Sequence, residues 1–331
     1  MIWEQIIGHQ PQIEMFRRAI ERERLAHGFL FVGPKGVGKR YFARLLAQCL
    51  FCERIPDVEL DACGECSSCR QMMGGTHPDL LSIGLPEGKK ILPISLLVGD
   101  DAHRGRAGLC YELAHAPMEA SRRIAIIDDA EAMNEEAANA LLKTLEEPPP
   151  GAILILLTPD TEAVLPTIRS RCQPVHFSSL NDEQLASILT AQGHATADVE
   201  PILSLAEGSL DVARRLLEPG LLQLWKTVEQ QFQHSNIDGM SAVKAVQSAL
   251  EALGTETAVQ RDNMFWAVRF TIESLRKKLA QTGNPNELDR LGEMLDRCFL
   301  AEQHLKQTMP VPLCLETLFL ELGRQSRMVV T

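Results

Sequence analysis

The sequence predicts an α/β domain with a parallel sheet covered by helices on both faces, followed by a small helical domain and a larger all-helical domain. Three observations predict it. Up to about residue 177, short apolar runs alternate with helical periods. A glycine-rich loop stands between one apolar run and a helical period. Beyond residue 178 no convincing strand pattern appears.

Length and composition are those of a folded protein with several domains. The chain has 331 residues, of which 45% are apolar and 23% charged, and its formal net charge is −11. The acidity argues against a stand-alone DNA-binding protein, because counterion release requires clustered Lys and Arg. No apolar stretch reaches the roughly 18 residues of a membrane span, and the N-terminus lacks a signal-peptide layout. We therefore expect a cytoplasmic protein without a membrane partner.

The first elements follow the order that phosphate binding requires. A helix is expected to begin near Pro11, with apolar residues on one face. Residues 28–32 (GFLFV) then predict a buried strand, which leads directly into the glycine loop at 33–40 (GPKGVGKR). After the loop, helical spacing continues to about residue 50. A strand, a glycine loop and a helix in this order favour a nucleotide-binding fold.

Two further strands and a capped helix complete the expected sheet. Residues 124–127 (IAII) predict a second buried strand, and 153–157 (ILILL) a third. Asn134 is a suitable cap for the helix between them, and the prolines at 148–150 end that helix. The glycine-rich stretch at 99–108 is expected to be a surface loop.

The rest of the chain is expected to form two helical domains. A small helical unit is predicted from 181 to about 217, and Pro219-Gly220 has the composition of a hinge. Apolar residues then recur at helical spacing over 265–279 and 288–298. We predict domains at 1–178, with a metal module at about 50–75, at 179–218 and at 219–331.

The glycine loop nearly satisfies the pattern G-x-x-x-x-G-K-[ST]. Gly33, Gly36 and Gly38 let backbone N–H groups turn toward phosphate oxygens, and Lys39 can reach the terminal phosphates. Arg40 replaces the hydroxyl that would hold Mg²⁺, and its charge repels the ion. Two interpretations remain open: a working ATP site that tolerates the change, and a vestigial loop without hydrolysis.

An acidic pair ends the second predicted strand. Asp128 stands where a metal-side carboxylate is expected, and Asp129 follows it where a longer Glu would polarise water. A shorter side chain displaces the carboxylate by about 1 Å, which can cost about 10²-fold in rate. The alternative is that the two residues simply terminate a strand.

Four of the nine cysteines lie within eighteen residues. Cys52, Cys63, Cys66 and Cys69 form the pattern C-x10-C-x2-C-x2-C. Four thiolates can close a tetrahedral shell around a structural Zn²⁺, leaving no open position for catalysis. Crowding in a reducing compartment favours metal over disulfide, and the alternative is a set of free thiols in a loop.

Ser170-Arg171-Cys172 follows the third strand. An arginine in a loop is commonly solvated or paired with a carboxylate. In an oligomeric nucleotide-binding fold, however, an exposed arginine at a subunit edge can reach a neighbour's γ-phosphate.

Taken together, these motifs resemble the delta-prime family of bacterial DNA polymerase III clamp-loader subunits, within the AAA+ ATPases. The resemblance covers about the first 180 residues. It rests on the stretches IGHQ (7–10), LAH (25–27), the loop at 33–39, HPD (77–79), AANALLKTLEEPP (137–149) and SRC (170–172).

The resemblance implies an assembly that loads a sliding clamp on primed DNA, with motor (gamma/tau) and delta subunits as partners. It implies an AAA+ P-loop domain with a zinc module, a helical lid and a C-terminal collar. Arg171 falls on the arginine-finger position, which acts in trans, and Thr158 falls on the sensor position. The four cysteines fall on the zinc module.

Two departures from the family pattern concern the ATP site. They are Arg40 and the pair Leu210-Asp211, which offers no arginine for a second sensor. We therefore expect a non-motor subunit without ATPase activity of its own, although ATP binding stays open. The alternatives are an ATP-hydrolysing clamp-loader motor or other AAA+ ATPase, and a zinc-dependent nucleic-acid binding module.

Overall fold

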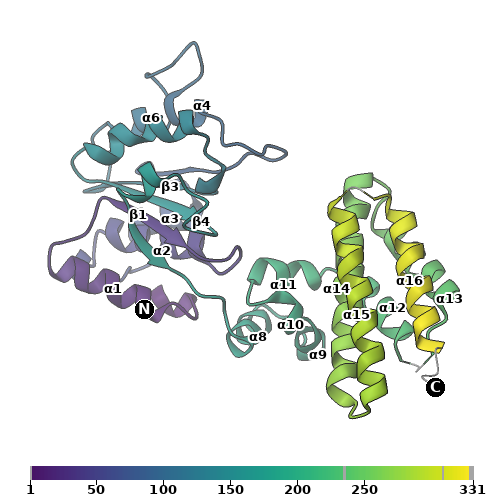
Figure 1. Ribbon diagram of the computed structural model, residues 1–331. Coiled ribbons are helices and arrows are strands. Elements are labelled where there is room, and N and C mark those ends of the chain that lie inside the picture. Colours follow the sequence, from purple (N-terminus) through teal and green to yellow (C-terminus); the bar gives the residue numbers. More distant parts are fainter. Residues whose placement is uncertain (1, 234–235, 308, 328–331) are drawn as a thin grey trace. The chain divides into compact units, whose positions relative to one another are not determined.

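The computed structural model describes residues 2–233, 236–307 and 309–327. They form two compact units (Figure 1). The first holds the residues up to Gly193 together with Glu207–Asp211, and the second holds His194–Ala206 and the residues from Val212 onward. The functional residues predicted above all lie in the first unit.

The first unit is built on one parallel sheet of five strands. Their order across the sheet is β2-β3-β4-β1-β5, with bounds β1 (Gly28–Val32), β2 (Leu80–Ile83), β3 (Arg123–Ile127), β4 (Ala152–Thr158) and β5 (Gln173–His176). Val32 pairs with Thr158, so the carboxyl ends of β1 and β4 meet at the same edge. The glycine loop begins at that edge, as it does in open α/β sheets that bind ligands there.

Helices cover both faces of the sheet, and each face has its own apolar core. Along β1, Phe29 and Phe31 join the core beneath α1 (Gln10–Glu21) and α2 (Lys39–Phe51). The alternate residues of β1 join the opposite core, which includes α6 (Glu135–Glu146). Figure 1 shows α1 and α2 on one side of the strands and α6 on the other. All five residues of β1 are buried, which explains its continuous apolar run.

The three strands expected from the sequence are confirmed, and two edge strands were missed. β2 is only half-buried, and β5 has one buried residue and contains Pro174. Edge strands need no continuous apolar run, and a proline is tolerated there because one side of the strand lacks a partner. Neither segment therefore carried the signal that identified the central strands.

Short helices connect these elements. They are the 3₁₀ turns η1 (Ile2–Gln5), η2 (Asp57–Glu59) and η3 (Ala130–Ala132), and the helices α3 (Ser67–Gly74), α4 (Ser95–Val98), α5 (Leu109–Leu113), α7 (Pro166–Arg169) and α8 (Asp182–Ala191). The predicted surface loop at 99–108 is confirmed between α4 and α5. Asn134 caps α6 as expected, because its Oδ1 accepts from the Ala137 N–H at 2.9 Å.

The second unit consists of helices, as its sequence pattern predicts. They are α9 (Thr196–Val199), η4 (Glu200–Ile202), α10 (Leu203–Ala206), α11 (Leu210–Leu216), whose first residues belong to the first unit, α12 (Pro219–Gln231), α13 (Gly239–Leu253), α14 (Thr257–Gln281), α15 (Pro285–Lys306) and α16 (Val311–Arg327). No helix within the described ranges is long and apolar enough to cross a membrane.

The expected hinge at Pro219-Gly220 is wrong. The two residues form the first turn of α12, where proline needs no N–H partner. A Cβ built on Gly220 would lie 2.4 Å from Cδ2 of Leu253 at the end of α13. The glycine therefore allows α12 and α13 to pack closely.

Candidate functional site

The glycine loop has the backbone of a phosphate-binding loop, but its lysine is occupied. Gly36 and Gly38 have φ values of +77° and +98°, a conformation that residues with a Cβ rarely adopt. The Lys39 Nζ donates to the carbonyls of Gly33 at 2.5 Å and Pro34 at 2.8 Å, and its side chain is buried. Burial lowers the pKa of this amine. The amine of Lys39 is therefore bonded to the backbone of the loop itself.

The carboxylates beside the loop are neutralised by basic side chains. Nη1 of Arg40 lies 3.6 Å from Asp128 Oδ2, so Arg40 stands against the carboxylate predicted for the metal side. Nζ of Lys35 lies 2.8 Å from Asp129 Oδ1 and 3.3 Å from Glu131 Oε1. Because each carboxylate already has a cationic partner, the acidic end of β3 offers little charge to a divalent cation.

A distant segment lies against the loop in the same unit. The Leu210 N–H donates to the Gly36 carbonyl at 2.9 Å. A Cβ on Gly36 would lie 2.1 Å from Ser209 Oγ and 3.1 Å from the Cβ of Asp211. This segment therefore brings an acidic residue close to the loop, where a second sensor would supply an arginine.

Thr158 ends β4 next to the loop. Its carbonyl accepts from the Gly33 N–H at 3.2 Å, and its hydroxyl donates to the Asp160 carbonyl at 2.9 Å. The residue is 1% exposed. The fold thus brings Thr158, the glycine loop and Asp128 to one edge of the sheet.

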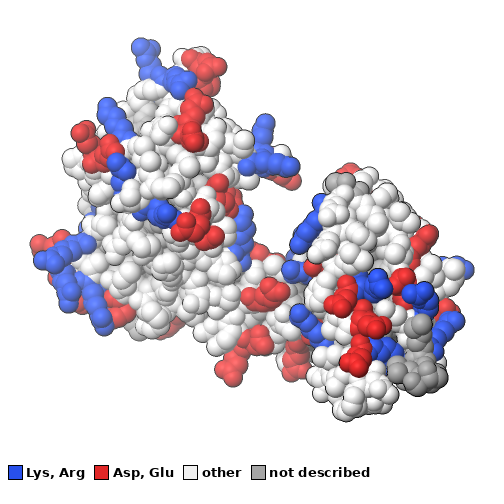
Figure 2. Space-filling view, in the orientation of Figure 1, with Lys and Arg blue, Asp and Glu red and all other residues white. Residues whose placement is uncertain are grey.

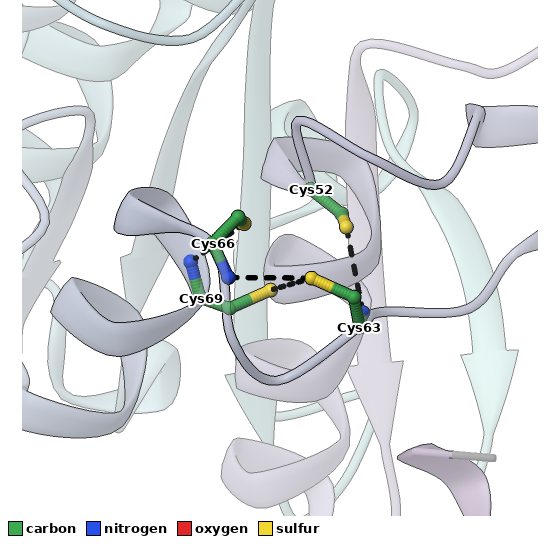
Figure 3. A group of neighbouring side chains, drawn as sticks. All are labelled: Cys52, Cys63, Cys66 and Cys69. Carbon is green, nitrogen blue, oxygen red and sulfur yellow. Dashed lines mark hydrogen bonds between the residues drawn. The ribbon is translucent and has the colours of Figure 1, made fainter.

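The four predicted cysteines converge between the end of α2 and the start of α3 (Figure 3). Their Sγ atoms all lie within 4.8 Å of one another, and those of Cys63 and Cys69 are 3.9 Å apart. A tetrahedral zinc site with Zn–S bonds of about 2.3 Å places sulfurs roughly 3.8 Å apart. An all-sulfur set at these separations fits a structural zinc ion after a contraction of about 1 Å at its widest point.

Backbone N–H groups point at the sulfurs. The Cys66 N–H donates to Cys63 Sγ at 3.3 Å, and the Cys69 N–H to Cys66 Sγ at 3.4 Å. The N–H groups of Glu65 and Cys66 lower the pKa of Cys63 to about 6, whereas burial raises the pKa of Cys69 to about 12. N–H donors of this kind stabilise thiolates, which are the metal-binding form.

The HPD motif ties the cysteine module to the sheet. His77 Nε2 lies 3.0 Å from Ser68 Oγ in α3, and its ring stacks on Phe51 at 4.3 Å. Because His77 Nδ1 accepts from the Asp79 N–H at 3.2 Å, its Nε2 carries the proton that Ser68 accepts. Asp79 directly precedes β2 and is fully buried.

Arg171 follows α7, and its side chain lies at the surface of the first unit. Its guanidinium pairs with Glu146 at the end of α6, with Nη2 and Oε1 2.6 Å apart.

 The same guanidinium donates from Nη1 to the Thr167 carbonyl at 3.0 Å and to Ser170 Oγ at 3.2 Å. The side chain stays about one-third exposed, so it lies at the surface and is paired within its own chain.

Sequence reasoning missed the partners of these residues. Nothing in the motifs indicated that Glu146 pairs with Arg171 or that Lys35 pairs with Asp129. The sequence did single out Glu146 as part of a motif, because it lies in the stretch AANALLKTLEEPP (137–149) on which the family resemblance rests. Its contact with Arg171 became visible only once the fold brought the two segments together.

Comparisons with known proteins give a consistent result. The family model described as "DNA polymerase III, delta subunit" matches residues 8–181, a little over half of the chain. DNA polymerase III subunit delta' of Pseudomonas aeruginosa is 36% identical over 60% of this chain and 58% of its own length. The delta' subunit of Bacillus subtilis is 32% identical over 60% of this chain and 55% of its own.

A relative with a different name matches a longer part of the chain. DNA polymerase III subunit tau of Escherichia coli is 30% identical over 77% of this chain and 36% of its own length. The matches thus span little more than half the length of the delta' relatives and about a third of the tau subunit.

Proposed function

The chain belongs to the DNA polymerase III delta subunit family, and we propose that it is a non-motor subunit of the bacterial clamp loader. In this role it helps to load a sliding clamp on primed DNA. Its partners are motor subunits of the gamma/tau type, a delta subunit and the clamp. In the AAA+ interpretation, the first unit is the nucleotide-binding-like domain, followed by a lid and a C-terminal collar.

The observation that carries the non-motor role is the pairing of Arg40 with Asp128. Phosphoryl transfer depends on a Mg²⁺ ion held by a hydroxyl and a carboxylate beside the phosphates. Here the hydroxyl is replaced by Arg40, and the carboxylate faces its guanidinium at 3.6 Å. Asp211 adds a negative side chain near the loop. These charges favour a vestigial loop over a working ATPase site.

Zinc is the proposed resident metal. Cys52, Cys63, Cys66 and Cys69 supply four sulfurs with no open position, which suits a structural ion rather than a catalytic one. When bound, the ion cross-links the end of α2 to the start of α3. The module has no place in phosphoryl transfer and supports the fold.

Arg171 is the residue through which this chain acts on ATP. We assign it as an arginine finger that stabilises the transition state on a nucleotide held by the next subunit. Its planar guanidinium offers fixed donors for the charge that spreads over the γ-phosphoryl oxygens, and such an insertion is worth about 10³ to 10⁵ in rate. Its side chain is about one-third exposed, which supports a role in trans.

The charge distribution supports action within an assembly rather than as a separate nucleic-acid module. On the face of each unit that Figure 2 shows, basic side chains are interspersed with acidic ones. A protein that binds DNA by itself needs a concentrated basic surface, which the net charge of −11 also disfavours.

The test is Arg171→Ala in a loader reconstituted with gamma/tau-type and delta subunits, a clamp and primed DNA. The variant should assemble normally, lower ATP hydrolysis by the share of the one site that faces it, and strongly reduce clamp loading. Arg169→Ala is the matched control, because Arg169 is a nearby arginine that pairs with Glu162 at 2.5 Å. Wild-type loading by the Arg171 variant would contradict the role in trans.

A further inference from the structure

Both terminal nitrogens of the Arg171 guanidinium bind acceptors of its own chain. Nη2 meets Glu146 Oε1 at 2.6 Å, while Nη1 donates to the Thr167 carbonyl and to Ser170 Oγ. Of these three acceptors, Glu146 alone carries a negative charge, and charge-assisted hydrogen bonds are the stronger ones. Glu146 therefore contributes most to holding this side chain in its observed position.

The backbone beneath this pair is packed closely. His27 Nε2 lies 3.0 Å from the Leu145 carbonyl, one residue before Glu146, and so fixes the end of α6. A Cβ built on Gly28 would lie 3.2 Å from the Arg171 carbonyl and 3.3 Å from Cδ2 of Leu145. The start of β1 thus joins the end of α6 to the segment that carries Arg171. The backbone that carries Glu146 is therefore held beside the segment of Arg171.

From this geometry we infer that Glu146 is a latch on Arg171, which restrains the finger until a neighbouring subunit presents a bound nucleoside triphosphate. The inference rests on the proposed function and adds its regulation. A γ-phosphate and the Glu146 carboxylate compete for the same Nη2 donor. The phosphate displaces Glu146 from Nη2 when the subunits close, because it carries more negative charge than one carboxylate.

The latch has a measurable strength. An ion pair between partly exposed side chains shifts an equilibrium by up to about fivefold. The negative charge of Glu146 also repels an approaching phosphate, and this repulsion, like the ion pair, opposes contact between Arg171 and the nucleotide. Removal of that charge should therefore raise hydrolysis at the neighbouring site most clearly before clamp and DNA drive the subunits together, by about two- to fivefold.

The first experiment tests the ion pair in the whole isolated chain, independently of any finger role. Arg171 is modified with phenylglyoxal, an arginine-specific reagent, and the rate is read by mass spectrometry. Glu146→Gln should speed the modification of Arg171 severalfold. Glu147→Gln is the matched control, because Glu147 is the exposed neighbour and has no ion pair within the described residues. Equal rates in all three proteins would overturn the latch.

The second experiment measures ATP hydrolysis by the reconstituted loader without clamp and DNA. Glu146→Gln should raise it two- to fivefold, Glu147→Gln should leave it unchanged, and Arg171→Ala with Glu146→Gln should match Arg171→Ala alone. If Arg171→Ala lowers hydrolysis but Glu146→Gln does not raise it, the latch is wrong and the finger stands. If Arg171→Ala has no effect on hydrolysis with or without clamp, Arg171 is not an arginine finger, and the proposed latch is wrong as well.

Discussion

The carboxylate of Asp79 joins several segments of the first unit. It is fully buried and accepts from the backbone N–H groups of residues 118–120 at 2.7–2.8 Å. Arg123 Nε lies 3.2 Å from the same carboxylate. Burial alone would raise the pKa of Asp79, but the N–H donors and Arg123 outweigh it and hold the pKa below its ordinary value of 3.8.

Asp79→Asn should therefore destabilise the protein at neutral pH. The substitution removes the carboxylate that pairs with the buried Arg123 Nε and leaves that guanidinium the partly exposed Glu112, at 3.6 Å, as a charged partner. It also turns an NH₂ group toward backbone donors, and we expect a total cost of about 3 kcal/mol. Urea unfolding at pH 7 measures the loss. Asp101→Asn, at an exposed position in the loop at 99–108, should change the free energy of unfolding by less than about 0.5 kcal/mol.

The stability difference between wild type and Asp79→Asn should also depend on pH. A carboxyl whose pKa is lowered on folding stabilises the fold above its unfolded pKa, and that stability is lost as pH falls through the folded pKa. The difference between wild type and Asp79→Asn should thus be full at pH 7 and shrink below about pH 4, where Asp79 takes up a proton. A difference that stays constant down to pH 2 would contradict the assigned ionisation.

At the scale of elements, the cysteine module is predicted to carry about one zinc per chain. Cys66→Ser should lose the ion, because Cys66 supplies both a sulfur and the cap of α3. Elemental analysis after purification without added metal measures the stoichiometry. Cys110→Ser is the control. Because Cys110 lies outside the cluster, this variant should keep the zinc. Substoichiometric zinc in gently purified wild-type protein would argue against the site.

Helix α6 gives a second prediction at this scale. Asn134 satisfies the Ala137 N–H at the start of the helix, and Glu135 and Glu136 face the positive end of its dipole. Asn134→Ala should lower the free energy of unfolding by about 1 kcal/mol, measured by urea denaturation. Asn134→Ser should restore most of it, because serine caps a helix equally well. An alanine variant as stable as wild type would show that the cap contributes little.

The elements differ in how far the sequence predicts them. Buried strands such as β1 can be predicted from an unbroken apolar run, because helices cover both of their faces. β5 has no such run, since it lies at the sheet edge with one buried residue. The first turn of α12 was mistaken for a hinge because Pro-Gly suits both a linker and a helix start that packs closely.

The candidate sites show the same contrast. Ligands close in sequence, such as Cys63 and Cys66, are predictable because a metal shell restricts their spacing. Ion pairs between distant segments are not, because a carboxylate and a guanidinium reveal their pairing only through tertiary structure. Glu146 and Arg171, and likewise Arg40 and Asp128, illustrate this limit.

At the scale of the whole molecule, the proposed role makes Arg171 a residue that serves another subunit's reaction, whereas the chain's own glycine loop departs from the pattern of a working ATP site. Lys39 is tied to the loop carbonyls, and Arg40 neutralises Asp128. Both contacts disfavour the positioning of Mg²⁺ that phosphoryl transfer requires, which supports the proposed non-motor role. The reaction it serves is therefore expected only in the assembly.

Hydrolysis of ATP should accordingly be absent from the isolated chain and should rise when the chain joins motor subunits. Steady-state phosphate release is measured for the chain alone, for motor and delta subunits without it, and for the full set. The full set should exceed the sum of its parts, because in the proposed role Arg171 supplies donors to a neighbour's γ-phosphate. Lys39→Ala should keep this stimulation, since the Lys39 amine donates to the carbonyls of Gly33 and Pro34 in its own loop. Turnover by the isolated chain at the rate of a motor subunit, abolished by Lys39→Ala, would instead identify the glycine loop as a working site.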